Sequence, residues 1–241
     1  MDSQSAGPLK KVLRATIKRT DSLTTALGLD LIIGFLVAGT TALLFIGLAE
    51  AVQSGTTMPL DNSVLQWMAA HQSHPATAVA LEITALGTGT VVIMLTAVTA
   101  MFLGLTGQRR LAVLLLVATI GGLALNLILK LQYHRQRPHI FAWDTNAVGS
   151  SFPSGHAMNA VIVYGTIAYL AAHLTRRRSG RAITQVLALF VFAAICTSRL
   201  YLGVHYPTDV LGGAVIGTAW AIFCICTLES VQRLRRDHSL T

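Results

Sequence analysis

The chain has 241 residues, of which 53% are hydrophobic and only 12% are charged, and its formal net charge is +8. With a mean hydropathy of +0.61, the composition excludes an ordinary soluble domain and indicates an integral membrane protein. Six runs are long and apolar enough to cross a hydrocarbon core of about 30 Å. They lie at residues 29–50, 77–105, 111–131, 156–175, 183–201 and 209–228. Because lipid offers the backbone no hydrogen-bond partners, we predict an all-α bundle of six transmembrane helices.

In chain order, the first run is too long for the apolar core of a signal peptide, so we interpret it as a retained span. After it, Leu60, Val64, Trp67 and Met68 recur at helical spacing, which predicts a short helix at the outer interface with Trp67 as an anchor. The second run is too long for a straight crossing and contains Gly-Thr-Gly at 87–89, so we expect it to tilt or break there. The three cysteines fall inside predicted spans, where they indicate packing and neither a disulfide nor a metal site.

The lysines and arginines are divided unevenly between the predicted loops. With the N-terminus in the cytoplasm, fourteen of the eighteen lie on the cytoplasmic side, and the outer side keeps Lys130, Arg135, Arg137 and Arg199. We therefore expect a multi-pass protein of the cell (inner) membrane with both termini in the cytoplasm. Residues 1–28 would be a cytoplasmic lead-in, 29–230 a single membrane domain and 231–241 a cytoplasmic tail. The net charge reflects this bias and attraction to anionic lipids, so nucleic acid is not an expected partner.

A first cluster of charges follows the third run, in the segment LNLILKLQYHRQRPH at 125–139. Lys130 and Arg137 are seven residues apart, about two helical turns, and would share nearly one face. Pro138 then turns the chain. A snorkelling lysine and a solvated flank explain the pair equally well. Three further residues of the segment are expected to face solvent or lipid headgroups: His134, Arg135 and His139.

A second cluster is the Pro-Ser-Gly-His sequence at 153–156, directly before the fourth run. Ser154 is a good N-cap, and the backbone amides around Gly155 and His156 would be unpaired at the positive end of a helix dipole. Such a helix start binds anions. Capping alone also explains the proline and the serine.

The third cluster, SRLYLGVHYPTD at 198–209, joins the fifth and sixth runs. His205 and Asp209 have the i,i+4 spacing that places both on one helix face. The carboxylate could accept a hydrogen bond from Nδ1 and leave Nε2 as a nucleophile, and Arg199 adds a cation. A histidine followed four residues later by an aspartate is also a common chance pattern.

The predicted topology brings all three clusters to the same outer side of the membrane. Cations, two histidines, a hydroxyl and a helix N-terminus at one surface are what the binding of a phosphate group requires. We therefore predict an active site at the outer ends of the helices, facing the periplasm or the extracellular space.

The segments KLQYHRQRP, PSGH and SRLYLGVHYPTD resemble the three-part signature of the type-2 phosphatidic acid phosphatase superfamily, K-x6-RP, PSGH and SR-x5-H-x3-D. The resemblance implies a metal-independent phosphohydrolase that needs no cofactor and works through a phosphohistidine. It implies that His205 attacks phosphorus, that Asp209 orients it, and that His156 protonates the leaving oxygen and later helps to activate water. It further implies a phosphate-binding set made of Lys130, Arg137, Ser154, Gly155 and Arg199.

A site at the ends of membrane helices suits a phosphate attached to a lipid, because the tail can stay in the bilayer. The resemblance implies phosphatidic acid, phosphatidylglycerophosphate or undecaprenyl diphosphate as the substrate. Two alternatives remain open from the sequence. The same pocket could transfer the phosphoryl group to another lipid or sugar, or the chain could be a non-catalytic anion channel or lipid carrier. No oligomeric state is predicted.

Overall fold

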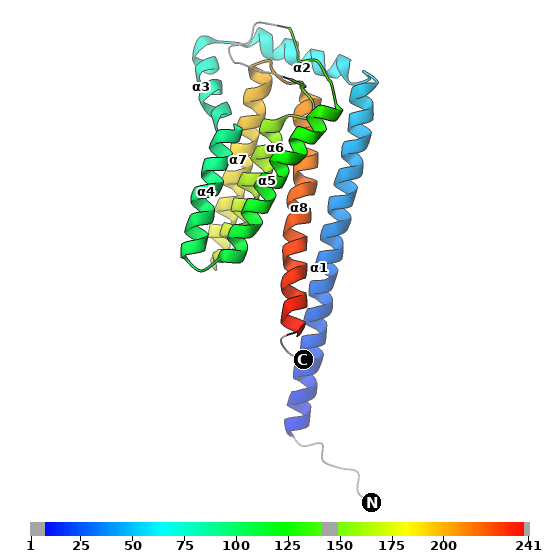
Figure 1. The fold of residues 1–241 in the computed structure, drawn as a ribbon, viewed down its shortest axis with the longest axis vertical. Helices are drawn as coiled ribbons and strands as arrows, with labels where there is room; N and C mark the ends of the chain where they lie inside the picture. The colour runs from blue at the N-terminus through cyan, green and yellow to red at the C-terminus, as the bar shows by residue number, and fades with distance from the viewer. Residues whose placement is uncertain (1–7, 141–148, 239–241) are drawn as a thin grey trace, which may run out of the picture.

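Within residues 8–140 and 149–238, which this computed structural model describes, all regular structure is helical (Figure 1). This confirms the predicted all-α fold. The helices are α1 (Pro8–Gln53), α2 (Met58–Ala70), α3 (His74–Ala85), α4 (Gly89–Leu105), α5 (Arg109–Gln132), α6 (Gly155–Leu174), α7 (Arg178–Tyr201) and α8 (Pro207–His238).

Five helices of the described part are each long and apolar enough to cross a membrane: Leu31–Gln53 of α1, α5, α6, α7 and Pro207–Gln232 of α8. The pair α3 and α4 passes the same test jointly, with a bend of 47° between the two helices, and counting it as one span gives six. The break lies where the sequence predicts it. Thr88 caps α4 there, its Oγ1 accepting a hydrogen bond from the backbone N–H of Val91 at 3.4 Å.

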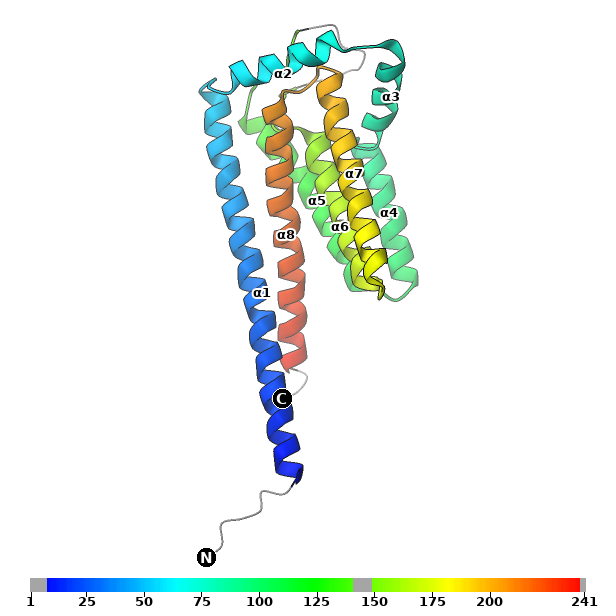
Figure 2. The ribbon, with the colours of Figure 1, turned by 180° about the vertical axis from the view of Figure 1, so that it is seen from behind.

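The helices form an elongated bundle in which α1 runs alongside α8 (Figures 1 and 2). The short helix α2 lies across one end of the bundle and connects α1 to α3. We call this end the α2 end. The start of α1 and the end of α8 lie at the opposite end. Residues 8–28 of the expected lead-in continue without a break into the first span, because α1 begins at Pro8.

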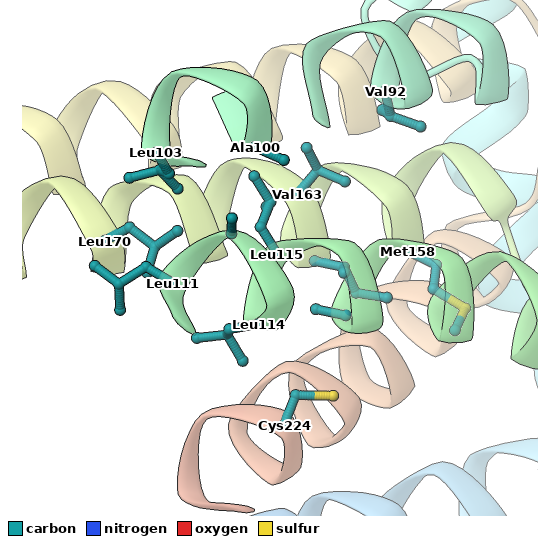
Figure 3. Close-up of a cluster of buried hydrophobic side chains, with 13 residues drawn as sticks. Val92, Ala100, Leu103, Leu111, Leu114, Leu115, Met158, Val163, Leu170 and Cys224 are labelled. Atoms are coloured by element: carbon teal, nitrogen blue, oxygen red, sulfur yellow. The ribbon is translucent and has the colours of Figure 1, made fainter. Parts of the chain in front are cut away.

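The main core lies between α4, α5, α6 and α8 (Figure 3). Val92 of α4, Leu115 of α5 and Met158 of α6 are completely buried in it. Large apolar side chains are also exposed on the outside of the bundle, such as Leu43 of α1 and Phe190 of α7. Apolar residues on both the inner and the outer faces are expected for helices surrounded by lipid.

Glycines allow α8 to lie very close to α6. A Cβ at Gly213 would collide with the carbonyl oxygen of Ser154 and lie 3.2 Å from the Cβ of Ala157. A Cβ at Gly217, one turn further along, would lie 2.5 Å from Val161 Cγ1. This close contact fixes the start of α6 against the start of α8.

We expect Gly213→Ala to destabilise the protein, because the new methyl group meets backbone atoms that cannot rotate away. Overpacking of this kind costs about 1–3 kcal/mol. Thermal unfolding in detergent would show it as a lower midpoint. Gly165→Ala in α6 is the matched control, since nothing lies within 4 Å of the added Cβ. An unchanged midpoint for Gly213→Ala would contradict the close approach of the two helices.

Candidate active site

His205 and Asp209 lie at the junction of α7 and α8, at the α2 end. Gly203 turns the chain after α7 with a φ of +67°, a conformation that residues with a Cβ rarely adopt. His205 Nδ1 lies 3.4 Å from Asp209 Oδ2. The same Oδ2 accepts a hydrogen bond from the backbone N–H of Tyr206 at 2.9 Å. The carboxylate therefore faces the Nδ1 side of the imidazole.

The other imidazole nitrogen, Nε2, faces a cation. Arg137 Nη1 lies 3.4 Å from His205 Nε2. A guanidinium can only donate, so Nε2 is the acceptor and the ring proton belongs on Nδ1, toward Asp209. Burial lowers the pKa of His205 to about 4, against the opposing effect of Asp209. The imidazole is thus neutral at pH 7 and has a lone pair on Nε2.

Ser154 is the N-cap of α6, as the sequence predicts, but its side chain makes no capping hydrogen bond. Its Oγ is buried and has no partner in the described part of the chain. Its backbone N–H donates to the carbonyl of Asp209 at 2.9 Å. Gly155 lets the start of α6 approach α5, because a Cβ there would lie 2.9 Å from Asn126 Oδ1. An unused hydroxyl and a helix start are therefore held beside the His205 loop.

His156, in the first turn of α6, packs against the break between α3 and α4. A Cβ at Gly87 would lie 3.0 Å from His156 Cδ2 and 2.8 Å from Ile195 Cγ2, so glycine permits this contact. Asn159 Nδ2 donates to the carbonyl of Gly87 at 3.1 Å and holds the break against α6. Within the described residues, His156 Nε2 is buried without a hydrogen-bond partner.

Three cations complete the group. Arg199, in the last turn of α7, donates from Nη1 to Thr84 Oγ1 at 2.7 Å, while its buried Nε has no partner among the described residues. Arg137 donates from Nη1 to the carbonyl of Val204 at 2.9 Å. Lys130, in the last turn of α5, interacts electrostatically with Arg137 and Arg199.

All eight residues that the sequence singles out thus lie at the α2 end. Electrostatic interactions link His156 to Arg199, His205, Lys130 and Arg137. Buried polar atoms are almost always hydrogen-bonded. Among the described residues, three atoms without a partner therefore mark a place for a polar ligand: Ser154 Oγ, His156 Nε2 and Arg199 Nε. A fourth, His205 Nδ1, faces Asp209 Oδ2 at 3.4 Å. Hydroxyl, guanidinium and helix-start donors suit a tetrahedral oxyanion such as phosphate.

The expectation that Arg135 faces solvent or headgroups is wrong. Its side chain is only 10% exposed and forms ion pairs of 2.6 Å with both Asp61 and Asp209. Asp61 comes from α2 and is completely buried. Burying this cation is feasible because two carboxylates surround it. Neither Asp61 nor its link to the site follows from the three motifs.

Two further residues of the broken span contribute to the site. Thr84 holds Arg199, and Gly87 leaves room for His156. The Gly-Thr-Gly sequence predicts the break itself. The contacts that the residues around the break make with α6 and α7 depend on tertiary packing, so the sequence does not reveal them.

Similarity to known proteins agrees with this geometry. Over 113 residues the chain is 39% identical to phosphatidylglycerophosphatase B of Bacillus subtilis, which covers 46% of this chain and 55% of that protein. Over 144 residues it is 26% identical to an undecaprenyl-diphosphatase of Sulfolobus acidocaldarius, covering 58% of this chain and 65% of the relative. The chain therefore spans somewhat more than half the length of these curated relatives.

A solved structure is also similar. The crystal structure of a transmembrane PAP2-type phosphatidylglycerolphosphate phosphatase from Bacillus subtilis superposes with a TM-score of 0.73 at 29% identity, over 78% of this chain and 94% of that chain. The family model of the PAP2 superfamily matches residues 111–233, about half of the sequence, and this stretch contains all three motifs. The chain belongs to the PAP2 superfamily.

Proposed function

We propose that this chain is an integral membrane phosphatase that hydrolyses the phosphomonoester or diphosphate of a lipid through a phosphohistidine intermediate. The observation that carries the proposal is the group of unpartnered polar atoms of Ser154, His156 and Arg199 beside the neutral imidazole of His205. Phosphoryl transfer mainly needs positioning and stabilisation of the charge on the equatorial oxygens, and fixed cations can supply both.

In the first step, His205 Nε2 attacks phosphorus, a P–N bond forms and the bond to the lipid oxygen breaks. His156, protonated beside the bound phosphate, gives its proton to that leaving oxygen. Asp209 stabilises the positive charge that develops on the His205 ring. In the second step, water attacks phosphorus, His156 takes a proton from it, and the P–N bond breaks to release orthophosphate. Lys130, Arg137 and Arg199 hold the phosphoryl oxygens throughout.

The location of the site supports a lipid substrate. The catalytic groups lie at the ends of helices whose outward faces carry exposed apolar side chains such as Leu127 and Leu131 of α5. A lipid tail can remain against these faces while its phosphate reaches His205. The similarity to a phosphatidylglycerophosphatase and an undecaprenyl-diphosphatase favours lipid monophosphates and polyprenyl diphosphates of this type.

We further propose that the α2 end faces away from the cytoplasm and that both termini lie inside the cell. The excess of lysine and arginine in the loops of the opposite end supports this orientation. A substrate lipid would then be dephosphorylated in the outer leaflet of the cell membrane.

The test is a phosphate-release assay of the purified protein with lipid monophosphates and diphosphates, in the presence of a chelator and with no added acceptor. We expect orthophosphate from at least one of these lipids. Absence of orthophosphate without an acceptor, together with transfer of the phosphoryl group to an added lipid or sugar acceptor, would indicate a phosphotransferase instead. Binding of the lipids with no turnover would indicate a carrier, and a need for Mg²⁺ would contradict the metal-free mechanism.

The nucleophile should stay active well below neutral pH. Burial lowers the pKa of His205 from 6.5 to about 4; Asp209 opposes this shift, and Arg199 and Arg137 add to it. Only the neutral imidazole can attack, so kcat/KM should fall as the pH drops through about 4. A pH profile of phosphate release, accompanied by unfolding midpoints at each pH, measures this limb. If kcat/KM instead fell with a midpoint near pH 6.5, the imidazole would not be desolvated.

A further inference from the structure

A buried ion network connects α2 to the carboxylate beside His205. Arg135 Nη1 lies 2.6 Å from Asp209 Oδ1, and its Nη2 lies 2.6 Å from Asp61 Oδ2. One planar guanidinium thus bridges two carboxylates that are both completely buried. The guanidinium also lies over the ring of Tyr206, 4.1 Å from its centroid. These contacts leave Arg135 a single well-defined position.

Asp61 is held as firmly as Arg135. Its Oδ1 accepts from the backbone N–H of Thr208 at 3.1 Å, and its Oδ2 accepts from Thr208 Oγ1 at 2.7 Å and from Thr57 Oγ1 at 3.0 Å. Thr208 directly precedes Asp209 in the first turn of α8. The helix that lies across the α2 end (Figure 2) is therefore joined to the same turn of α8 that carries the site carboxylate.

The network fixes which oxygen of Asp209 faces the nucleophile. Arg135 donates to Oδ1, while Oδ2 accepts a hydrogen bond from the backbone N–H of Tyr206 at 2.9 Å and lies 3.4 Å from His205 Nδ1. Rotation of the carboxylate would break the short ion pair with Arg135. Without the guanidinium, two buried carboxylates would also lose their shared positive charge, so keeping both ionised would cost more free energy.

We propose that Arg135 and Asp61 are positioning residues, which hold the Asp209 carboxylate ionised and turned toward His205 Nδ1, so that the Nε2 lone pair faces the substrate phosphorus. The proposal rests on the phosphatase function proposed above. It assigns a role to α2 that lies outside the three sequence motifs. Arg135 acts through Asp209, whereas the other cations of the site contact phosphate directly.

The kinetic test compares Arg135→Met, Arg135→Lys and Asp61→Asn with the parent protein. We expect Arg135→Met to lower kcat about 10- to 100-fold with little change in KM, since it removes an interaction that matters in the transition state. Arg135→Lys should recover part of the loss, because it keeps one charge but cannot bridge both carboxylates. The kcat of Asp61→Asn should lie between those of Arg135→Met and Arg135→Lys. Arg178→Met and Glu82→Gln, both at exposed positions, are matched controls that should retain full activity.

A double-mutant cycle tests whether Arg135 acts through Asp209. In an Asp209→Asn background, Arg135→Met should cost less than about threefold in kcat, because the carboxylate it positions is already gone. If Arg135→Met lowered kcat in that background as much as it does in the parent protein, or if it changed only KM, the proposal would be overturned in favour of direct phosphate binding. Wild-type kcat in both Arg135→Met and Asp61→Asn would overturn it as well.

A second measurement does not depend on turnover. In protein labelled with ¹⁵N-histidine, the shifts of His205, assigned by their absence in His205→Ala, should show the Nδ1–H tautomer in the parent and a mixture of tautomers in Arg135→Met. Identical tautomers in both proteins would refute the positioning role, whatever the enzyme activity. Absence of phosphate release from the parent protein would refute the proposed phosphatase instead, so the two failures are distinguishable.

Discussion

Replacing His205 by alanine is expected to abolish phosphate release from lipid phosphates while leaving the protein folded. The imidazole Nε2 is the proposed attacking atom, whereas the neighbouring Ser154 hydroxyl and the cations are assigned to phosphate binding and His156 to proton transfer. Loss of a nucleophile reduces kcat by on the order of a thousandfold or more in enzymes of this kind. Initial rates of orthophosphate release, with detection reaching below a thousandth of the parent rate, measure the effect.

The matched control is His173→Ala. His173 is exposed near the end of the same helix that begins with Gly155 and His156 of the candidate site, at the opposite end of the bundle. It should keep parental activity. Because His205 is 2% exposed, its removal leaves a cavity, so His205→Gln serves as a second variant of larger volume. Full activity in either folded His205 variant would refute the phosphohistidine mechanism.

Local spacing made much of this site predictable from the sequence. His205 and Asp209 are separated by one helical turn, and Ser154 to His156 form a single helix start. The spacing within each motif therefore already determines how its residues lie relative to one another. Hydropathy and charge then placed the motifs at one end of a helical bundle. This placement was possible because the side chains that meet in space lie at the ends of helices whose direction is fixed by the crossing of a membrane.

The contacts that support the site were not predictable in the same way. Arg135 and Asp61 are 74 residues apart, and Arg199 and Thr84 are 115 residues apart. In the sequence, Asp61 resembles an acidic residue that complements the dipole of a short helix, and its burial depends on how α2 packs on α8. One signal was present: four cations on the side that the charge bias disfavours need partners, and Arg135 has two.

His156→Gln is expected to slow hydrolysis of lipid monoesters about 10²- to 10⁴-fold, the usual contribution of a general acid. The size of the loss should depend on the leaving group. A lipid alkoxide needs the proton as its bond to phosphorus breaks, whereas 4-nitrophenolate or the monophosphate released from a lipid diphosphate leaves readily without it. The ratio of parent to variant rates should therefore shrink along that series, while the deficit of His205→Ala should stay complete for every substrate.

The second half of the reaction gives the sharper test of the same residue. With 4-nitrophenyl phosphate, His156→Gln should still form the phosphohistidine but should lose the base that activates water. The variant should then release a burst of about one 4-nitrophenolate per protein molecule, followed by slow turnover, and labelled phosphate should remain on the protein after an alkaline quench that preserves P–N bonds. His156 is half-buried beside Gly87, and glutamine fits a similar volume, so a folded variant is expected. Equal deficits for all leaving groups, with no burst and no trapped phosphate, would show that His156 only positions the substrate and transfers no proton.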